Sequence, residues 1–237
     1  MFNGKKFLVV DDEPDLREIL RDELEFAGGE LSEAENGVAA FQLASEKVFD
    51  AILSDIRMPG GDGMTLARKI KERPGKNPVV FLVTGFADFT PAEAYDIGVE
   101  GFIYKPFNLG PVLENLQRAL EEPAVRWARS LKISAPKVLP VTGTLTELLQ
   151  GNKIKLGTGG FFLNGLFPDI RKEENVQLNL SDKTTITGVV RWSQTAENDK
   201  GLQAGLGIEI LHINKEGMDA FVKEIEAKAP RAHIPRL

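Results

Sequence analysis

Acidic, hydroxyl and amine side chains stand at the ends of four apolar runs of the sequence. They are Asp11 and Asp12, Asp55, Thr84 and Lys105. Carboxylates that lie close together repel one another and raise each other's pKa, so such a group needs a compensating cation. Oxygen ligands suit Mg²⁺, which usually takes one or two protein carboxylates, and the lysine supplies a second positive charge. A carboxylate beside both cations can act as a nucleophile toward phosphorus, because the cations neutralise charge on the transferring oxygens.

The elements that must position these side chains alternate between strands and helices. Short apolar runs predict strands, and apolar residues at helical spacing between them predict helices. The expected strands are 7–10, 30–34, 51–53, 79–83 and 101–104, each followed by a helix. The predicted fold class is therefore α/β, with a doubly wound five-stranded parallel sheet. Ligands of such sheets bind at the carboxyl ends of the strands, where the side chains above would converge.

The pattern changes after residue 122, so we expect the first domain to be 1–122. Three prolines and scattered cations predict a linker over 123–141. Short strands with turn signals then predict a small all-β barrel over 142–230, closed by a C-terminal helix. Residues 231–237 are expected to form a tail.

Residues 5–120 resemble the receiver domain of response regulators, which is CheY-like and has a flavodoxin-like fold. The matching motifs are Asp11-Asp12, Asp55 within SDIRMPGGDG, Thr84-Gly85 and Lys105-Pro106-Phe107. The resemblance implies that Asp55 is the phosphoacceptor and that Lys105 pairs with the phosphoryl group. It also implies that Asp11 and Asp12 hold Mg²⁺ together with Asp55 and the backbone carbonyl of Arg57.

Two further features follow from the same resemblance. A cis peptide bond is expected before Pro106, where proline lowers the cost of the cis form. Thr84 and Phe102 match the hydroxyl–aromatic pair that switches on phosphorylation in this family. Each motif also has a plainer interpretation: the Asp-Asp pair as a turn or helix cap, Lys105 as a solvated charge and Phe102 as ordinary core. These plainer interpretations would require every matching residue to stand at its strand end by chance.

The C-terminal region resembles a PilZ domain over 157–163, 188–192 and 205–210. Many members bind cyclic di-GMP through an Arg-x-x-x-Arg segment and an Asp/Asn-x-Ser-x-x-Gly turn. Here the turn reads Lys-Leu-Gly-Thr-Gly-Gly over 155–160, and the upstream arginines are separated by two residues instead of three. The candidate nucleotide residues are Arg126, Arg129, Thr158 and Gly160. The departures favour a degenerate PilZ-like domain that acts by protein–protein interaction.

Composition excludes several classes of function. The net charge of −6 disfavours non-specific nucleic-acid binding, and the absence of cysteine excludes disulfides, thiolate zinc sites and thiol catalysis. No apolar run is long enough to cross a bilayer, and no signal-peptide pattern is present. These features predict a cytoplasmic protein without membrane insertion.

The expected function is that of a two-component response regulator in a phosphorelay. A sensor histidine kinase would phosphorylate Asp55, and the chain would pass the signal to a downstream protein, directly or through a change to a homodimer. The alternative is a cyclic di-GMP sensor that receiver phosphorylation modulates. DNA binding ranks last, because no helix-turn-helix is recognisable. A metabolic enzyme is disfavoured, because His212 and His233 are expected at a strand end and in a frayed tail, and the receiver would assist only its own phosphorylation and dephosphorylation.

Overall fold

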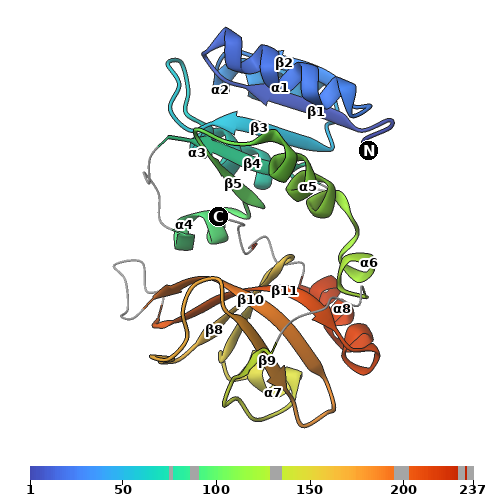
Figure 1. Cartoon of the computed structure of the whole chain (residues 1–237), viewed down its shortest axis with the longest axis vertical. Coiled ribbons are helices and arrows are strands. Elements are labelled where there is room, and N and C mark those ends of the chain that lie inside the picture. Colours follow the sequence, from blue (N-terminus) through green and yellow to red (C-terminus); the bar gives the residue numbers. More distant parts are fainter. Residues whose placement is uncertain (75–76, 86–90, 129–134, 195–202, 229–232, 234–237) are drawn as a thin grey trace. The chain divides into compact units, whose positions relative to one another are not determined.

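The computed structural model describes residues 1–74, 77–85, 91–128, 135–194, 203–228 and 233. The chain divides into two compact units, which Figure 1 shows with their elements labelled. The first unit contains Met1–Thr90 and Val99–Leu120, and the second contains Pro91–Gly98 and Glu121–Arg236. The boundary therefore differs from a simple division at residue 122, because an internal segment joins the second unit.

The first unit contains a five-stranded parallel sheet with the strand order β2-β1-β3-β4-β5. The strands are β1 (Lys6–Val10), β2 (Glu30–Ala34), β3 (Ala51–Asp55), β4 (Val79–Thr84) and β5 (Gly101–Tyr104). This confirms the sheet predicted from the alternating pattern. The apolar runs are continuous because parallel strands bury both of their faces.

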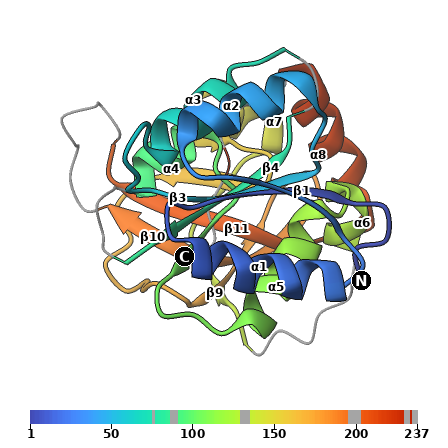
Figure 2. The same ribbon diagram turned by 90° about the horizontal axis from the view of Figure 1, so that it is seen from above.

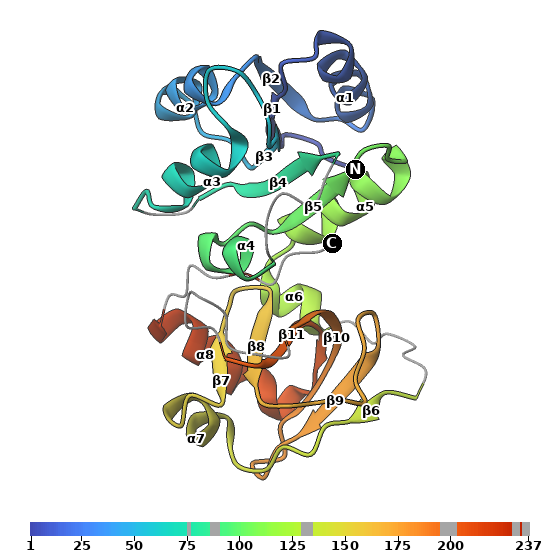
Figure 3. The ribbon, with the colours of Figure 1, turned by 90° about the vertical axis from the view of Figure 1, so that its left-hand side faces the viewer.

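Helices cover both faces of this sheet. They are α1 (Pro14–Phe26), α2 (Gly37–Glu46), α3 (Gly63–Lys71) and α5 (Leu109–Leu120). Figures 2 and 3 show α1 and α5 on one face and α2 and α3 on the other. One core joins Leu24 of α1 and Leu116 of α5 to inward side chains of the strands, such as Phe81. Asp62 caps α3 as expected, since its side chain accepts a hydrogen bond from the backbone N–H of Thr65 at 2.8 Å.

The second unit contains a six-stranded mixed sheet with the order β6-β9-β10-β11-β8-β7. Its strands are β6 (Lys137–Val138), β7 (Ile154–Leu156), β8 (Gly160–Asn164), β9 (Asn175–Asn179), β10 (Thr185–Gln194) and β11 (Gly205–Ile213). The pairs are antiparallel except β6 with β9, which is parallel. The predicted barrel is not confirmed, because no pairing between β6 and β7 closes the sheet among the described strands.

The described residues of the second unit contain four helices. They are α4 (Pro91–Ile97), α6 (Pro123–Ala128), α7 (Leu145–Gln150) and α8 (Lys215–Lys228). The closing helix predicted near the C-terminus is α8, and Phe221 on it is fully buried. No helix in the described part of the chain combines the length and the apolar character that a membrane span needs.

The segment 123–141 was expected to be a linker, and three of its described residues, Trp127, Leu139 and Val141, are buried in the second unit's core. Trp127 of α6 is fully buried and packs edge-on against Phe221, with ring centroids 5.4 Å apart. Leu139 and Val141 belong to the same apolar cluster. Prolines and cations suggested a solvated segment, but the apolar residues between them carry the packing.

His233 also differs from the expected frayed tail. Its side chain is only 4% exposed, and its backbone N–H donates to the carbonyl of Tyr95 at 3.0 Å. Its Nδ1 lies 2.7 Å from the hydroxyl of Thr158. The remaining residues of the predicted tail lie outside the described residues.

A buried ion pair ties the end of α3 to the amino ends of β4 and β5. The Lys71 ammonium donates to both carboxylate oxygens of Glu100, at 2.6 and 2.8 Å, and to the carbonyl of Pro78 at 2.9 Å. Glu100 also accepts the backbone N–H of Val80 at 2.7 Å. Removing one partner of such a pair leaves an uncompensated buried charge.

We expect Lys71→Met to lower the free energy of unfolding by about 3 kcal/mol, because the Glu100 carboxylate loses its cation. Glu18→Gln is the control, since it breaks an exposed pair with Arg21 on α1 and should change stability by no more than about 0.5 kcal/mol. Urea denaturation of both variants measures the difference. Equal losses in the two variants would contradict a structural role for the buried pair.

Candidate functional site

The carboxyl edge of the first sheet collects the side chains predicted to carry chemistry. Asp55 is the last residue of β3 and Thr84 the last of β4. Asp11 directly follows β1, and Lys105 directly follows β5. The parallel order β1-β3-β4-β5 makes these strand ends neighbours, which is why one sheet edge brings the four residues together.

The Lys105 ammonium is the centre of this cluster. It lies 2.9 Å from Oδ1 of Asp55, 3.2 Å from Oδ2 of Asp11 and 3.1 Å from Oε1 of Glu13. Asp11 and Asp55 are nearly fully buried, whereas Glu13 is exposed. One cation therefore compensates two buried carboxylates, as the repulsion argument required.

Burial and charge act in opposite directions on the ionisable groups of the cluster. Burial raises the pKa of Asp11 above its usual value, and the hydrogen bond from the Glu13 N–H and the charge of Lys105 only partly oppose this. Burial alone would lower the pKa of Lys105, but its bonds to Asp55 and Glu13 and the charge of Asp11 raise it overall. Lys105 therefore stays protonated throughout the neutral range.

The two carboxylate oxygens of Asp55 have different hydrogen-bond donors. Oδ2 accepts the backbone N–H of Arg57 at 2.6 Å, and Oδ1 faces the Lys105 ammonium. The group opens on a cavity of about 220 Å³ lined by Asp12, Glu13, Asp55, Arg57, Thr84, Gly85 and Lys105. A carboxylate oriented by two donors and facing a cavity is placed to react with a phosphoryl compound.

The donors around this cavity fit a magnesium ion. Asp12 and Asp55 both line it, and Arg57 lines it as well, so that two carboxylates are available with water access, and the Arg57 carbonyl stays the predicted third ligand of the kind that Mg²⁺ favours. No cluster of three or more His, Cys, Asp or Glu side chains is arranged around one metal position among the described residues. Asp11 uses Oδ1 for the Glu13 N–H and Oδ2 for Lys105, so its role as a metal ligand stays a prediction.

The expected switch pair lies on adjacent strands. Thr84 is 3% exposed and lines the cavity, and its carbonyl accepts the Lys105 N–H at 2.7 Å. Phe102 is buried on β5, in register with Leu82 of β4. The peptide bond between Lys105 and Pro106 is cis, as the resemblance implied.

Two contacts of the site were missed by sequence reasoning. Glu13 reaches Lys105, and the guanidinium of Arg17 donates to the backbone carbonyl of Asp11 at 2.5 Å. Glu13 continues the acidic run and so carried a signal. Arg17 stands on the first turns of α1, where a surface cation is the ordinary expectation, and nothing in the sequence marked its contact.

The candidate nucleotide residues that the structure describes lie on different elements of the second unit. Arg126 is buried on α6, and its guanidinium donates to the carbonyl of Glu121 at 2.8 Å. Thr158 lies in the turn between β7 and β8, and Gly160 begins β8. Arg129 lies outside the described residues. Arg126 and Thr158 both already contact residues of the second unit itself.

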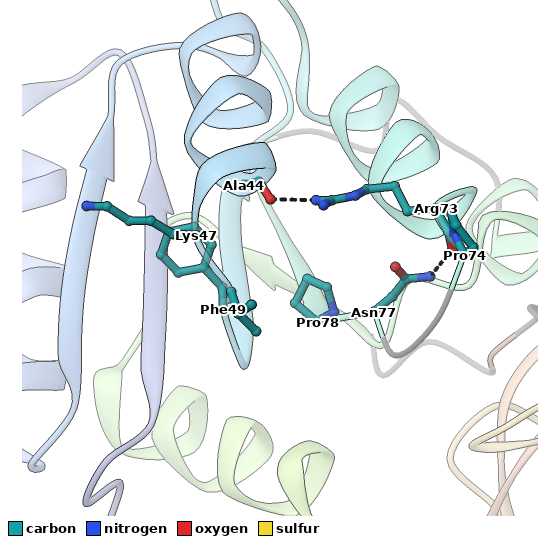
Figure 4. Close-up of a pocket in the computed structure, with 8 residues that line it drawn as sticks. Ala44, Lys47, Phe49, Arg73, Pro74, Asn77 and Pro78 are labelled. Atoms are coloured by element: carbon teal, nitrogen blue, oxygen red, sulfur yellow. Dashed lines mark hydrogen bonds between the residues drawn. The ribbon is translucent and has the colours of Figure 1, made fainter.

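A second cavity of the first unit lies at the opposite, amino end of the strands. It has a volume of about 80 Å³, and Figure 4 shows Phe49 and Pro78, which precede β3 and β4, lining it with Arg73. The Arg73 guanidinium donates to the Ala44 carbonyl at 2.6 Å. No carboxylate is among the described residues that line this cavity, and they do not offer the chemistry of the Asp55 site.

Comparison with known proteins agrees with this geometry. The family model described as "Response regulator receiver domain" matches residues 7–117. Residues 7–117 are therefore a response regulator receiver domain, which places Asp55, Thr84 and Lys105 within that domain.

Curated relatives share about this part of the chain. Transcriptional regulatory protein ResD of Bacillus subtilis is 37% identical over 106 residues, which cover 45% of this chain and 44% of ResD. DNA-binding transcriptional regulator NtrC of Escherichia coli is 36% identical over 113 residues, which cover 47% of this chain and 24% of NtrC. The matches thus span less than half the length of each of these relatives.

Similar solved structures include two response regulators. The chemotaxis response regulator CheY4 of Vibrio cholerae is 30% identical, with a TM-score of 0.45, over 48% of this chain and 98% of that chain. The response regulator TrrA of Thermotoga maritima, solved in complex with Mg(2+)-BeF, is 31% identical, with the same TM-score and coverage.

Gly63 packs closely against the backbone of Asp55, and replacing this glycine tests whether the close packing is required for stability. A Cβ at Gly63 would lie 2.1 Å from the backbone carbonyl oxygen of Asp55, which no side-chain rotation relieves, whereas a Cβ at Gly110 on α5 would meet nothing within 4 Å. We expect Gly63→Ala to cost about 2 kcal/mol of stability and Gly110→Ala to be neutral or stabilising. Urea denaturation distinguishes them, and equal tolerance would contradict this close approach.

Proposed function

We propose that the chain is a two-component response regulator in which Asp55 accepts a phosphoryl group from a sensor histidine kinase. The observation that carries the proposal is the Asp55 carboxylate, oriented by the Lys105 ammonium at 2.9 Å and the Arg57 N–H at 2.6 Å at the mouth of a cavity. The match of residues 7–117 to receiver domains supports the same assignment.

The chemistry is a transfer of phosphorus between two protein side chains. A carboxylate oxygen of Asp55 attacks the phosphorus of a phosphohistidine, the new P–O bond forms, and the P–N bond breaks with its electron pair returning to the imidazole. Lys105 stays protonated and neutralises charge on the phosphoryl oxygens. A bound Mg²⁺, held by Asp12, Asp55 and the Arg57 carbonyl, would supply further neutralisation of that charge.

Thr84 and Phe102 would transmit the change. Phosphorylation adds roughly one to two negative charges and new acceptor oxygens, and the Thr84 hydroxyl lines the cavity in which they appear. A hydrogen bond from Thr84 to the phosphoryl group would draw it inward, and Phe102 on the adjacent strand would then repack. In this proposal the receiver assists only its own phosphorylation and dephosphorylation and turns over no other substrate.

The second unit would be the output, a degenerate PilZ-like module that works by protein–protein interaction. Its support is the motif likeness together with the mixed sheet, in which the Lys155–Gly160 turn joins β7 to β8. ResD and NtrC are transcriptional regulators by name, and the NtrC name includes DNA binding. DNA binding stays the weaker alternative here, because the net charge is −6.

We expect beryllofluoride with Mg²⁺ to shift the backbone amide signals around Thr84 and Phe102, because it mimics a phosphoryl group on Asp55. The Asp55→Asn variant should show no shift, since the nucleophilic carboxylate is gone. NMR of the full chain measures both. An unchanged wild-type spectrum, or the same shifts in the variant, would refute the assignment of Asp55.

The alternative function, sensing of cyclic di-GMP, predicts heat on titration of the full chain with that nucleotide. We expect none at micromolar concentrations, because the Arg126 guanidinium is bonded within the second unit and Thr158 contacts His233. Calorimetry with and without beryllofluoride tests this. Heat in either state would favour the nucleotide-sensing function over the interaction module.

A further inference from the structure

The second unit contains one helix that the chain supplies from within the receiver sequence. This helix is α4, in the segment Pro91–Gly98, which packs with Glu121–Arg236. In the sequence it lies between Thr84 and Phe102, the two residues proposed to respond to phosphorylation. A change that begins at those two residues therefore reaches both ends of the α4 segment through the chain itself.

Tyr95 anchors α4 on the second unit. Its side chain is fully buried, and its hydroxyl donates to the backbone carbonyl of Lys155 at 2.7 Å. Its ring meets Trp192 of β10 edge-on, with centroids 6.3 Å apart, and Trp192 in turn stacks on Phe162 of β8 at 4.9 Å. Burial raises the pKa of the Tyr95 hydroxyl, so it remains a hydrogen-bond donor at neutral pH.

Lys155 adds a charged contact beside this anchor. Its ammonium pairs with the Asp96 carboxylate at 2.6 Å and lies 5.1 Å from the centre of the Tyr95 ring. An aromatic side chain followed by an acid on α4 thus matches an exposed lysine on β7. The complementary pattern on the second unit is an aromatic surface with one cation at its border.

His233 covers the turn next to α4. Its ring contacts the Thr158 hydroxyl, and its backbone bonds to Tyr95. A Cβ added at Gly159 would lie 2.2 Å from the His233 ring, so the ring rests directly on the glycine backbone. Gly159 and Gly160 are both buried.

The covered surface also holds an unsatisfied donor. Trp192 is 5% exposed, and its indole Nε1 has no hydrogen-bond partner among the described residues. A buried donor without an acceptor costs roughly 1–3 kcal/mol. This donor lowers the stability of the covered state, and an acceptor on an incoming segment would satisfy it.

We propose that α4 and His233 form an intramolecular cover over an aromatic docking surface, made of Phe162 and Trp192 with Lys155 at its border. Receiver phosphorylation releases α4, and the surface then binds a protein segment of the same chemistry as α4, an aromatic side chain beside a carboxylate. This inference rests on the proposed phosphorylation of Asp55 and goes beyond it by naming the contact that is released.

Hydrogen–deuterium exchange of the full chain tests the cover, with the backbone amides of 154–164 and 187–194 as reporters. We expect Tyr95→Ala to raise exchange in both segments by on the order of tenfold, and Tyr95→Phe to raise it less, since the ring stays and only the hydroxyl is lost. Tyr104→Ala is the matched control, because Tyr104 is half-exposed on β5. Unchanged exchange in Tyr95→Ala would overturn the proposal.

A second variant tests His233 without a substitution on α4. Gly159→Ala should expel the His233 ring and raise exchange in the turn 155–160, with α8 remaining protected as evidence of a folded unit. Acrylamide quenching gives an independent readout, because Trp127 lies in the core beside Phe221 and only Trp192 lies beneath the cover. Unchanged quenching in both Tyr95→Ala and Gly159→Ala would also overturn the proposal.

Beryllofluoride with Mg²⁺ separates this inference from the proposed function. We expect it to raise exchange over 154–164 in the wild-type chain and to have no such effect in Asp55→Asn. If the amides around Thr84 and Phe102 respond while 154–164 does not, the release of α4 is refuted and the phosphorylation site stands. If neither region responds, both fail, and the Tyr95 variants still decide whether the cover exists.

Discussion

The receiver site depends on the ion pairs that the Lys105 ammonium makes. Two buried carboxylates at adjacent strand ends repel one another, and a fixed cation between them offsets this repulsion. Lys105 contacts Asp11 and Asp55 at once. In the proposed function the same cation that compensates the cluster would also provide charge for a phosphoryl group, so that stability and chemistry would share one residue.

The receiver half was predictable because its information is local and periodic. Apolar runs of strand length alternate with helical spacing, and each polar residue of interest ends a run, so the strand order alone brought Asp55, Thr84 and Lys105 together. The contacts of Glu13 and Arg17 are side-chain details at that edge. The contact of Arg17 was not predictable, because its partner is a backbone carbonyl, and every residue has a backbone carbonyl whatever its side chain.

The second unit was predicted less well because its packing joins distant segments. The prolines of 123–141 indicated a linker, yet Trp127 lies in a core with Phe221. His233 looked like part of a loose tail, yet it packs on the turn at Gly159. In each case a few isolated side chains make the contact, without a repeating pattern around them, and an interpretation based on periodicity cannot detect such contacts between segments distant in the sequence.

The energies at α4 suit a contact that a phosphoryl group can break. The Lys155–Asp96 pair is about half-exposed and contributes at most about 1 kcal/mol, while the unpartnered Trp192 indole opposes closure. Moving an equilibrium from 1:99 to 99:1 takes about 5.5 kcal/mol, and hydrogen bonds to a charged group contribute about 1.5–3 kcal/mol each. In the proposed mechanism, two or three bonds to phosphorylated Asp55 that form only when α4 is released would be enough to move a cover that rests mainly on one tyrosine, whereas a broad apolar interface would stay closed.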